Sequence, residues 1–293
     1  MRSLALVSLV ALALGEAAAG EKRAAPKAPG KGRTGMFFGS YEPPTKPEHE
    51  HLRDRLRKAR ALEQFSEALS ALRLPEPLRI KFASCDGESN AWYEPSDKTV
   101  TFCYEYVADL EQASGGAAAH GIPAEVAFMG GVAFVLLHET SHALFDLLEV
   151  PILGREEDAA DNVAAFLLLS AGEGIARRVL SGATWMYLQD SMGQKLDESD
   201  FSDVHGLGSQ RFYNVLCIAY GSNPQSFQGI VAKGYLPKER AESCGEEFRQ
   251  VAYAMKKLVA PNVDATERVR IRAAHKRPSD APGLQAQPAG RRH

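Results

Sequence analysis

Two histidines and a glutamate have the types and the spacing needed to bind a metal ion and use it. His138 and His142 are four residues apart and Glu139 follows the first of them, which is the HExxH pattern. On a helix, side chains four residues apart project from one face, so both imidazoles can bind the same ion. Neutral imidazole nitrogens suit Zn²⁺, and Glu139 is then placed to take a proton from a water molecule on the metal. The motif therefore predicts a catalytic site with one zinc ion.

The sequence around the motif argues against two histidines that occur there by chance. Residues 132–137 and 143–145 are all apolar. Burying two imidazoles and a carboxylate in such a helix is costly unless these groups have a partner. A bound metal ion is such a partner, so we interpret the motif as a metal site.

An acidic segment shortly after the motif supplies a third ligand. Glu157 and Asp161 are four residues apart and share a face of the next expected helix. We expect Glu157 to be the third metal ligand, with the fourth position open for water. Asp161 is expected to accept a hydrogen bond from a ligand histidine and fix its tautomer. Glu156 and Asp158 are expected to point elsewhere, and the alternative for Glu157 is that it too only stabilises the helix dipole.

The elements that must position these residues follow from apolar periodicity and turn residues. Strands are expected at 78–82, 91–93 and 99–102, the last two joined as a hairpin by the turn at 94–97. Because the strands come early and the helices late, the expected fold class is α+β, with a small N-terminal sheet or hairpin and a helical C-terminal part. The expected helices cover about 48–73, 123–149, 156–180, 208–221 and 240–258.

The chain has four cysteines, and an even number in an exported chain favours two disulfides. Three pairings are possible. We prefer Cys85–Cys103 and Cys217–Cys244, because each closes a short loop. A four-thiolate zinc site would need CxxC-type pairs, which the sequence lacks, and a nucleophilic cysteine is a minor alternative.

The two ends of the chain have a different composition from the middle. Residues 1–19 combine a basic start, an apolar run and small residues, as a cleaved signal peptide does. That run is shorter than the about 20 residues that span a bilayer, so we expect no stable membrane anchor. We expect a flexible linker over 20–47, one domain over 48–265 and a disordered tail over 266–293. The predicted location is outside the cytoplasm, either secreted or periplasmic.

The charge balance of the whole chain excludes one class of partner. The formal net charge is −3, from 34 Lys and Arg against 37 Asp and Glu. A protein that binds nucleic acid usually carries a clear excess of basic residues. No nucleic-acid partner is therefore expected.

HETSH followed by GREEDAAD resembles the gluzincin zinc peptidases of the thermolysin type. In that family the third ligand is the Glu of an ExxxD on a following helix, which is Glu157 here, although the gap from His142 is shorter than in thermolysin. The segment 203–209 resembles the one that carries the family's transition-state histidine. This implies that His205 donates to the oxyanion and that Asp203 orients it. The alternative is an exposed loop histidine without a role.

Residues 36–262 as a whole are similar to a family of secreted bacterial metallopeptidases without a known substrate. The segments that carry the similarity are CDGESNAWYEPSDKTVTFCYEY, the HETSH helix, GREEDAAD, HGLGSQRFYN and LPKERAESC. The resemblance implies a secreted, zinc-dependent, zincin-like metallopeptidase fold but supplies no substrate. Our leading hypothesis is hydrolysis of peptide bonds in a peptide or protein substrate, with Glu139 as general base. The strand at 90–93 then forms a cleft edge, or else only a structural hairpin. Two alternatives stay open: a zinc-containing binding or scaffold protein without turnover, and a hydrolase of a non-peptide amide.

Overall fold

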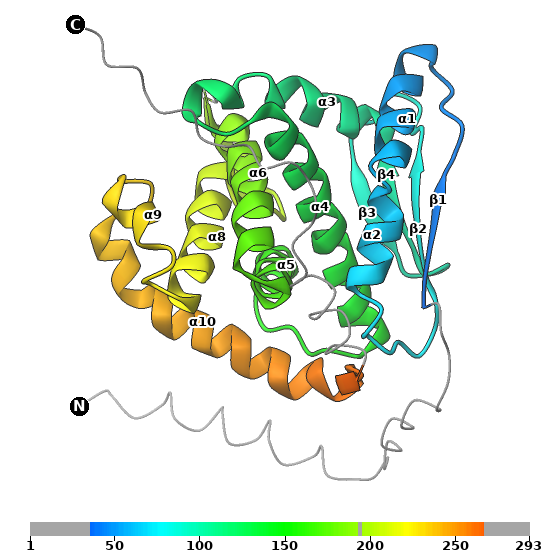
Figure 1. Cartoon of the computed structure of the whole chain (residues 1–293). Helices are drawn as coiled ribbons and strands as arrows, with labels where there is room; N and C mark the ends of the chain where they lie inside the picture. The colour runs from blue at the N-terminus through cyan, green and yellow to red at the C-terminus, as the bar shows by residue number, and fades with distance from the viewer. Residues whose placement is uncertain (1–35, 193–194, 267–293) are drawn as a thin grey trace, which may run out of the picture. The chain divides into compact units, whose positions relative to one another are not determined.

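The structure is a computed structural model that describes residues 36–192 and 195–266 of the 293-residue chain. The expected signal peptide, the first part of the expected linker and all but one residue of the expected tail lie outside the described residues. Within the described residues, a small sheet lies beside a set of helices (Figure 1). No helix of the described part is long and apolar enough to cross a membrane.

The sheet has four strands in the order β1-β2-β4-β3. β2 (Leu78–Ala83) pairs in parallel with β4 (Thr99–Cys103), and β3 (Ala91–Glu94) pairs with β4 in antiparallel orientation. These three strands confirm the expected strand and hairpin. β3 is the edge strand on the side of α4 (Ala124–Leu147), the helix that carries the HExxH motif.

The fourth strand, β1 (Phe37–Tyr41), lies in the range expected to be linker, so that part of the linker expectation is wrong. β1 pairs in parallel with β2, with Phe37 opposite Leu78. Its partner lies about 40 residues further along the chain, and only Phe37 of its five residues is buried. Buried and exposed residues do not alternate along β1, so its local sequence does not indicate a strand. Its hydrogen-bonded pairing with β2 defines it instead.

The expected single helix over 48–73 is two helices after a short 3₁₀ turn, η1 (Pro47–His49). α1 (Glu50–Lys58) and α2 (Ala61–Ala68) are separated at Arg60, whose φ of 53° is left-handed. The break lets both helices bury their own apolar residues, and α2 then packs against β1. Apolar periodicity continues through the break, so the sequence pattern could not reveal it.

α3 (Tyr104–Ser114) follows β4 directly and was not expected from the sequence. Its Tyr104, Val107 and Leu110 are buried at three-residue steps, and a 3₁₀ turn, η2 (Ala117–His120), leads on to α4. α4 itself confirms the long apolar helix. Figure 1 shows it between α6 and the sheet, in contact with both.

The expected helix over 156–180 is also two helices, α5 (Glu156–Ala171) and α6 (Glu173–Ser191). They are separated at Gly172, whose φ of 124° is one that other residues rarely adopt. α6 then packs closely on α4, since a Cβ added to Gly182 would lie 2.6 Å from the Cα of Gly130. The break therefore brings α6 back along the motif helix.

The remaining helices confirm the expected helical C-terminal part. They are α7 (Glu198–Ser202), α8 (Gly208–Ser222), α9 (Gln228–Ala232), α10 (Lys238–Leu258) and the 3₁₀ turn η3 (Ala260–Asn262). Both expected disulfides are present. Cys85–Cys103 joins the segment after β2 to the end of β4, and Cys217–Cys244 joins α8 to α10. The fold is thus α+β with a small mixed sheet and two disulfides.

Candidate metal centre

The structure brings the three expected ligands together from two helices. His138 and His142 lie on α4, and Glu157 lies in the first turn of α5. One ligand atom from each residue lies within 4.8 Å of the others. The Nε2 atom of His138 is 3.0 Å from Oε2 of Glu157 and 3.2 Å from Nε2 of His142. Two imidazole nitrogens and a carboxylate oxygen that face one another are a donor set that fits a divalent ion such as Zn²⁺.

The Glu157 carboxylate is surrounded by imidazoles. His138, His142 and His205 all direct Nε2 toward it, at 3.0 Å, 3.6 Å and 3.0 Å. Although partial burial acts in the opposite direction, hydrogen bonds from these histidines hold the pKa of Glu157 well below its usual range. Glu157 therefore stays ionised, as a metal ligand must.

Glu139 is buried next to this cluster. Burial raises the pKa of its carboxyl, while the neighbouring His138 and His142 act to lower it. A carboxylate in this state is suited to taking up and releasing a proton.

Glu156 contacts His142, which corrects the expectation that it points away from the motif. Its Oε1 atom is 2.8 Å from Nδ1 of His142. Although burial acts in the opposite direction, hydrogen bonds with Glu157 and Glu156 raise the pKa of His142 to about 9. The Glu156 contact occupies Nδ1 and leaves Nε2 of His142 facing the cluster. Helical spacing missed this contact because it depends on how α4 and α5 meet.

Asp161 is almost fully buried and receives hydrogen bonds from three other helices. Its Oδ1 atom is 2.8 Å from Nδ1 of His138 and accepts a hydrogen bond of 2.8 Å from the Tyr187 hydroxyl. Arg211 on α8 donates from Nε to Oδ2 and from Nη2 to Oδ1, both at 2.8 Å. Although burial acts in the opposite direction, the hydrogen bonds from Arg211 and His138 hold the pKa of Asp161 well below its usual range.

Tyr187 and Arg211 are site residues that the sequence did not reveal. The Arg211 guanidinium lies 4.4 Å from the centre of the Tyr187 ring. Arg211 is part of the HGLGSQRFYN segment. Along the chain, however, Arg211 is 50 residues and Tyr187 is 26 residues from Asp161, the residue that both contact. No local pattern links residues at such separations, so tertiary structure alone reveals the contact.

His205 and Asp203 lie at the open side of the cluster. The Nδ1 atom of His205 is 3.0 Å from Oδ1 of Asp203, and the same Asp203 oxygen accepts a hydrogen bond from the His205 backbone. The His205 side chain is 48% exposed. His205 therefore faces Glu157 with Nε2, while about half of its side chain remains accessible to solvent.

A hollow of about 580 Å³ lies beside His205. It opens between the start of α5 and the segment from α7 to α8, and its lining includes Arg155, Asp158, Phe201, Leu207 and Tyr213. Both charged and aromatic groups therefore face the space next to the candidate centre.

The hairpin is joined to the motif helix one turn after His142. The Tyr93 hydroxyl of β3 and the Lys98 ammonium both donate to Oδ2 of Asp146, at 2.6 Å and 2.8 Å. These contacts hold the edge strand β3 along α4, on the same helix as His138 and His142.

One comparison with known proteins supports a metal-dependent chemistry. A family model described as “Putative metallopeptidase” matches residues 41–259, which include every residue of the candidate centre. Neither the comparison with curated proteins nor that with solved structures found a match. Since the family match covers well over half of the chain, the chain belongs to this metallopeptidase family, whose name implies a bound metal ion and a peptide or protein substrate.

Proposed function

We propose that the protein is an exported zinc metalloendopeptidase of the gluzincin type, with a zincin-like fold. One observation carries the proposal. In a member of a metallopeptidase family, the ligand atoms of His138, His142 and Glu157 lie within 4.8 Å of one another, beside the buried carboxyl of Glu139. The two disulfides are compatible with export.

Three residues would hold the ion. Asp161 occupies Nδ1 of His138 and Glu156 occupies Nδ1 of His142, so each histidine offers Nε2 to the metal. Glu157 offers its carboxylate. When bound, Zn²⁺ acts as a Lewis acid that activates water and polarises the scissile carbonyl group.

Glu139 moves the proton. Its carboxylate takes a proton from the attacking water and then passes it to the nitrogen of the leaving amine. Burial supports this role, because a raised pKa brings the proton affinity of the carboxyl closer to that required of a base near neutral pH.

His205 stabilises the substrate's carbonyl oxygen as negative charge develops on it. Asp203 accepts from Nδ1 of His205, so Nε2 is a second donor directed toward the cluster when the ring is protonated. The Glu157 and Asp203 carboxylates favour that form because they raise the pKa of His205. A hydrogen bond from Nε2 to the substrate oxygen becomes stronger as charge grows there, which lowers the barrier to hydrolysis.

The substrate is an extended peptide that pairs with the edge strand β3. The strand lies at the edge of the sheet and is held along α4 by the Asp146 contacts. Main-chain pairing would align the peptide past the histidines, and the hollow beside His205 would take one of its side chains.

The test uses the purified full-length protein, its His138→Ala variant and its Glu139→Gln variant. We expect one zinc per chain in the wild type by elemental analysis, and loss of zinc from His138→Ala. Glu139→Gln should keep the metal and lose about 10²- to 10⁴-fold in cleavage of a broad peptide library.

Two outcomes would overturn the proposal. A wild type without bound metal would exclude a metallopeptidase. A zinc-loaded wild type that cleaves no peptide, with Glu139→Gln indistinguishable from it, would favour a scaffold protein without turnover.

A further inference from the structure

We propose that Arg211 is a positioning residue of the metal centre, because through Asp161 it sets the direction in which His138 presents its ligand nitrogen. This inference rests on the proposed metal-dependent function. It adds a determinant of metal affinity that is not itself a ligand and that lies on a helix without ligands.

The first step is the bidentate ion pair between Arg211 and Asp161. Two nitrogens of one guanidinium donate to the two oxygens of one carboxylate, both at 2.8 Å. Such a bidentate pair fixes the plane of the carboxylate as well as its position. The Tyr187 hydroxyl adds a third donor at 2.8 Å on Oδ1. Asp161 is thus held in one orientation.

The second step is the effect on His138. Oδ1 of a carboxylate only accepts, so the 2.8 Å contact places the hydrogen of His138 on Nδ1. In a ring that binds a metal ion, Nδ1 keeps this hydrogen and the lone pair of Nε2 would be the ligand. Nε2 already faces Glu157 and His142 at 3.0 Å and 3.2 Å. A rotated Asp161 would leave Nδ1 without its acceptor and would release the ring from this orientation.

The third step is why arginine is required. The Asp161 side chain is only 3% exposed, and a carboxylate so buried needs a partner of opposite charge. Arg211 also lies 4.4 Å from the centre of the Tyr187 ring, so its planar group is held by stacking. The ammonium of a lysine could supply the charge but neither the bidentate pair nor the stacking.

The backbone brings α8 close enough for this contact. A Cβ added to Gly208 at the start of α8 would lie 2.8 Å from the Tyr187 carbonyl oxygen on α6. His138, Asp161, Tyr187 and Arg211 come from α4, α5, α6 and α8, so the four helices meet at one carboxylate. The orientation of His138 therefore depends on the packing of the whole helical part.

The experiment measures metal affinity in the full-length protein by competition of zinc with a chromophoric chelator. We expect Arg211→Met to bind zinc about 10- to 100-fold more weakly than the wild type. The absorption spectrum of the cobalt-substituted protein should also change, because His138 is no longer held in one orientation. Arg211→Lys should bind zinc with intermediate affinity.

Arg55→Met is the matched control. Arg55 also lies over an aromatic ring, 3.8 Å from the centre of Phe128, and also pairs with a carboxylate, that of Glu111, at 2.5 Å. This variant removes the same kind of interactions at another place. It should lose fold stability without losing zinc affinity or altering the cobalt spectrum.

If Arg211→Met keeps the zinc affinity and cobalt spectrum of the wild type, the inference is wrong while the proposed function stands. If the wild type itself binds no metal, the proposed function fails first. Should Arg211→Met not fold, Tyr187→Phe decides, since it removes only the third donor to Asp161. A several-fold weaker zinc affinity in Tyr187→Phe supports the inference, and an unchanged affinity overturns it.

Discussion

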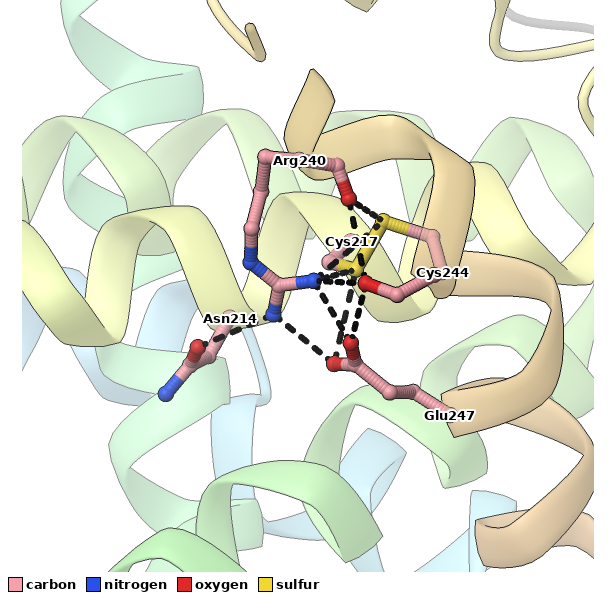
Figure 2. Close-up of a disulfide and its surroundings, with 6 residues drawn as sticks. Asn214, Cys217, Arg240, Cys244 and Glu247 are labelled. Atoms are coloured by element: carbon pink, nitrogen blue, oxygen red, sulfur yellow. Dashed lines mark hydrogen bonds and ion pairs between the residues drawn. A yellow bond between two sulfur atoms is a disulfide. The ribbon is translucent and has the colours of Figure 1, made fainter. Parts of the chain in front are cut away.

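Two arginine–carboxylate pairs contact α8, and they differ in almost everything except their chemistry. Arg211 and Asp161 have side chains that are 16% and 3% exposed, whereas Arg240 and Glu247 are 28% and 37% exposed. The first pair joins α8 to α5, and its Asp161 also contacts His138. The second joins two positions of α10 and lies beside the Cys217–Cys244 disulfide (Figure 2).

Figure 2 shows the Arg240 guanidinium between Asn214 and the Glu247 carboxylate, with the disulfide next to it. Arg240 donates to both Glu247 oxygens, at 2.6 Å and 2.7 Å, and to Oδ1 of Asn214 on α8 at 3.3 Å. A covalent bond already connects α8 and α10 here. The partly exposed pair therefore adds little, whereas the buried pair joins α8 to α5 and fixes the orientation of Asp161.

Removal of one partner of the buried pair should have the largest effect on stability. Asp161→Ala leaves the Arg211 charge buried without compensation, and we expect a loss of about 3–5 kcal/mol in the free energy of unfolding. Denaturant titration measures it. The double variant Asp161→Ala with Arg211→Met should regain part of this loss, because no charge is left unpaired. A double variant no more stable than the single one would contradict this account of the buried pair.

Removal of the disulfide beside the Arg240–Glu247 pair should have the second-largest effect on stability. Cys217→Ser with Cys244→Ser opens a loop with a sequence separation of 27 residues. The chain-entropy model predicts a loss of about 3.5 kcal/mol in the free energy of unfolding, again measured by denaturant titration. Zinc affinity should not change, because neither cysteine contacts the metal centre. A loss of affinity would show that the covalent link also positions the site.

A substitution at Gly172, where the backbone breaks before α6, should have a smaller effect on stability. Gly172→Ala places a side chain on a residue with φ of 124°, which costs on the order of 1–3 kcal/mol. Part of that strain should displace α6 and its Tyr187, so zinc affinity should fall as well. Gly174→Ala, in the first turn of α6 with open space around it, is the control and should lower neither quantity, because alanine favours a helix over glycine.

Removal of the partly exposed Arg240–Glu247 pair should have the smallest effect on stability. We expect Arg240→Met to cost less than about 1 kcal/mol and to leave zinc affinity unchanged. Hydrogen bonds from Arg240 lower the pKa of Glu247 in the folded protein. The stabilising contribution is therefore present above the unfolded pKa of about 4.3 and is lost as the pH falls. Unfolding measured at pH 7 and pH 3 checks this, since the difference between wild type and variant should be smaller at the lower pH.

Local interactions explain which parts of the fold the sequence predicted. Helix α4, the strand β2 and the β3–β4 hairpin carry their own periodicity and turn residues. The breaks at Arg60 and Gly172 were not predicted, because apolar periodicity runs through both. β1 was missed for a related reason, since its pairing with β2 joins distant parts of the chain.

The residues of the candidate centre also fall into those that local spacing predicted and those that only the structure revealed. Spacing along single helices was enough to select His138, His142 and Glu157, which the structure places around one point. Spacing gave the wrong direction for Glu156, because its contact with His142 depends on the angle between two helices. Arg211 and Tyr187 could not be found from any local pattern.

The sequence by itself determined which groups we propose to bind the metal ion. The i and i+4 positions of a helix share a face wherever the helix lies, so HExxH specifies two ligands and a carboxyl without reference to the fold. Only the tertiary structure decided how these ligands are held. Asp161, Tyr187 and Arg211 meet across 26 and 50 residues of chain, and such contacts exist only once the helices have packed around a buried charge.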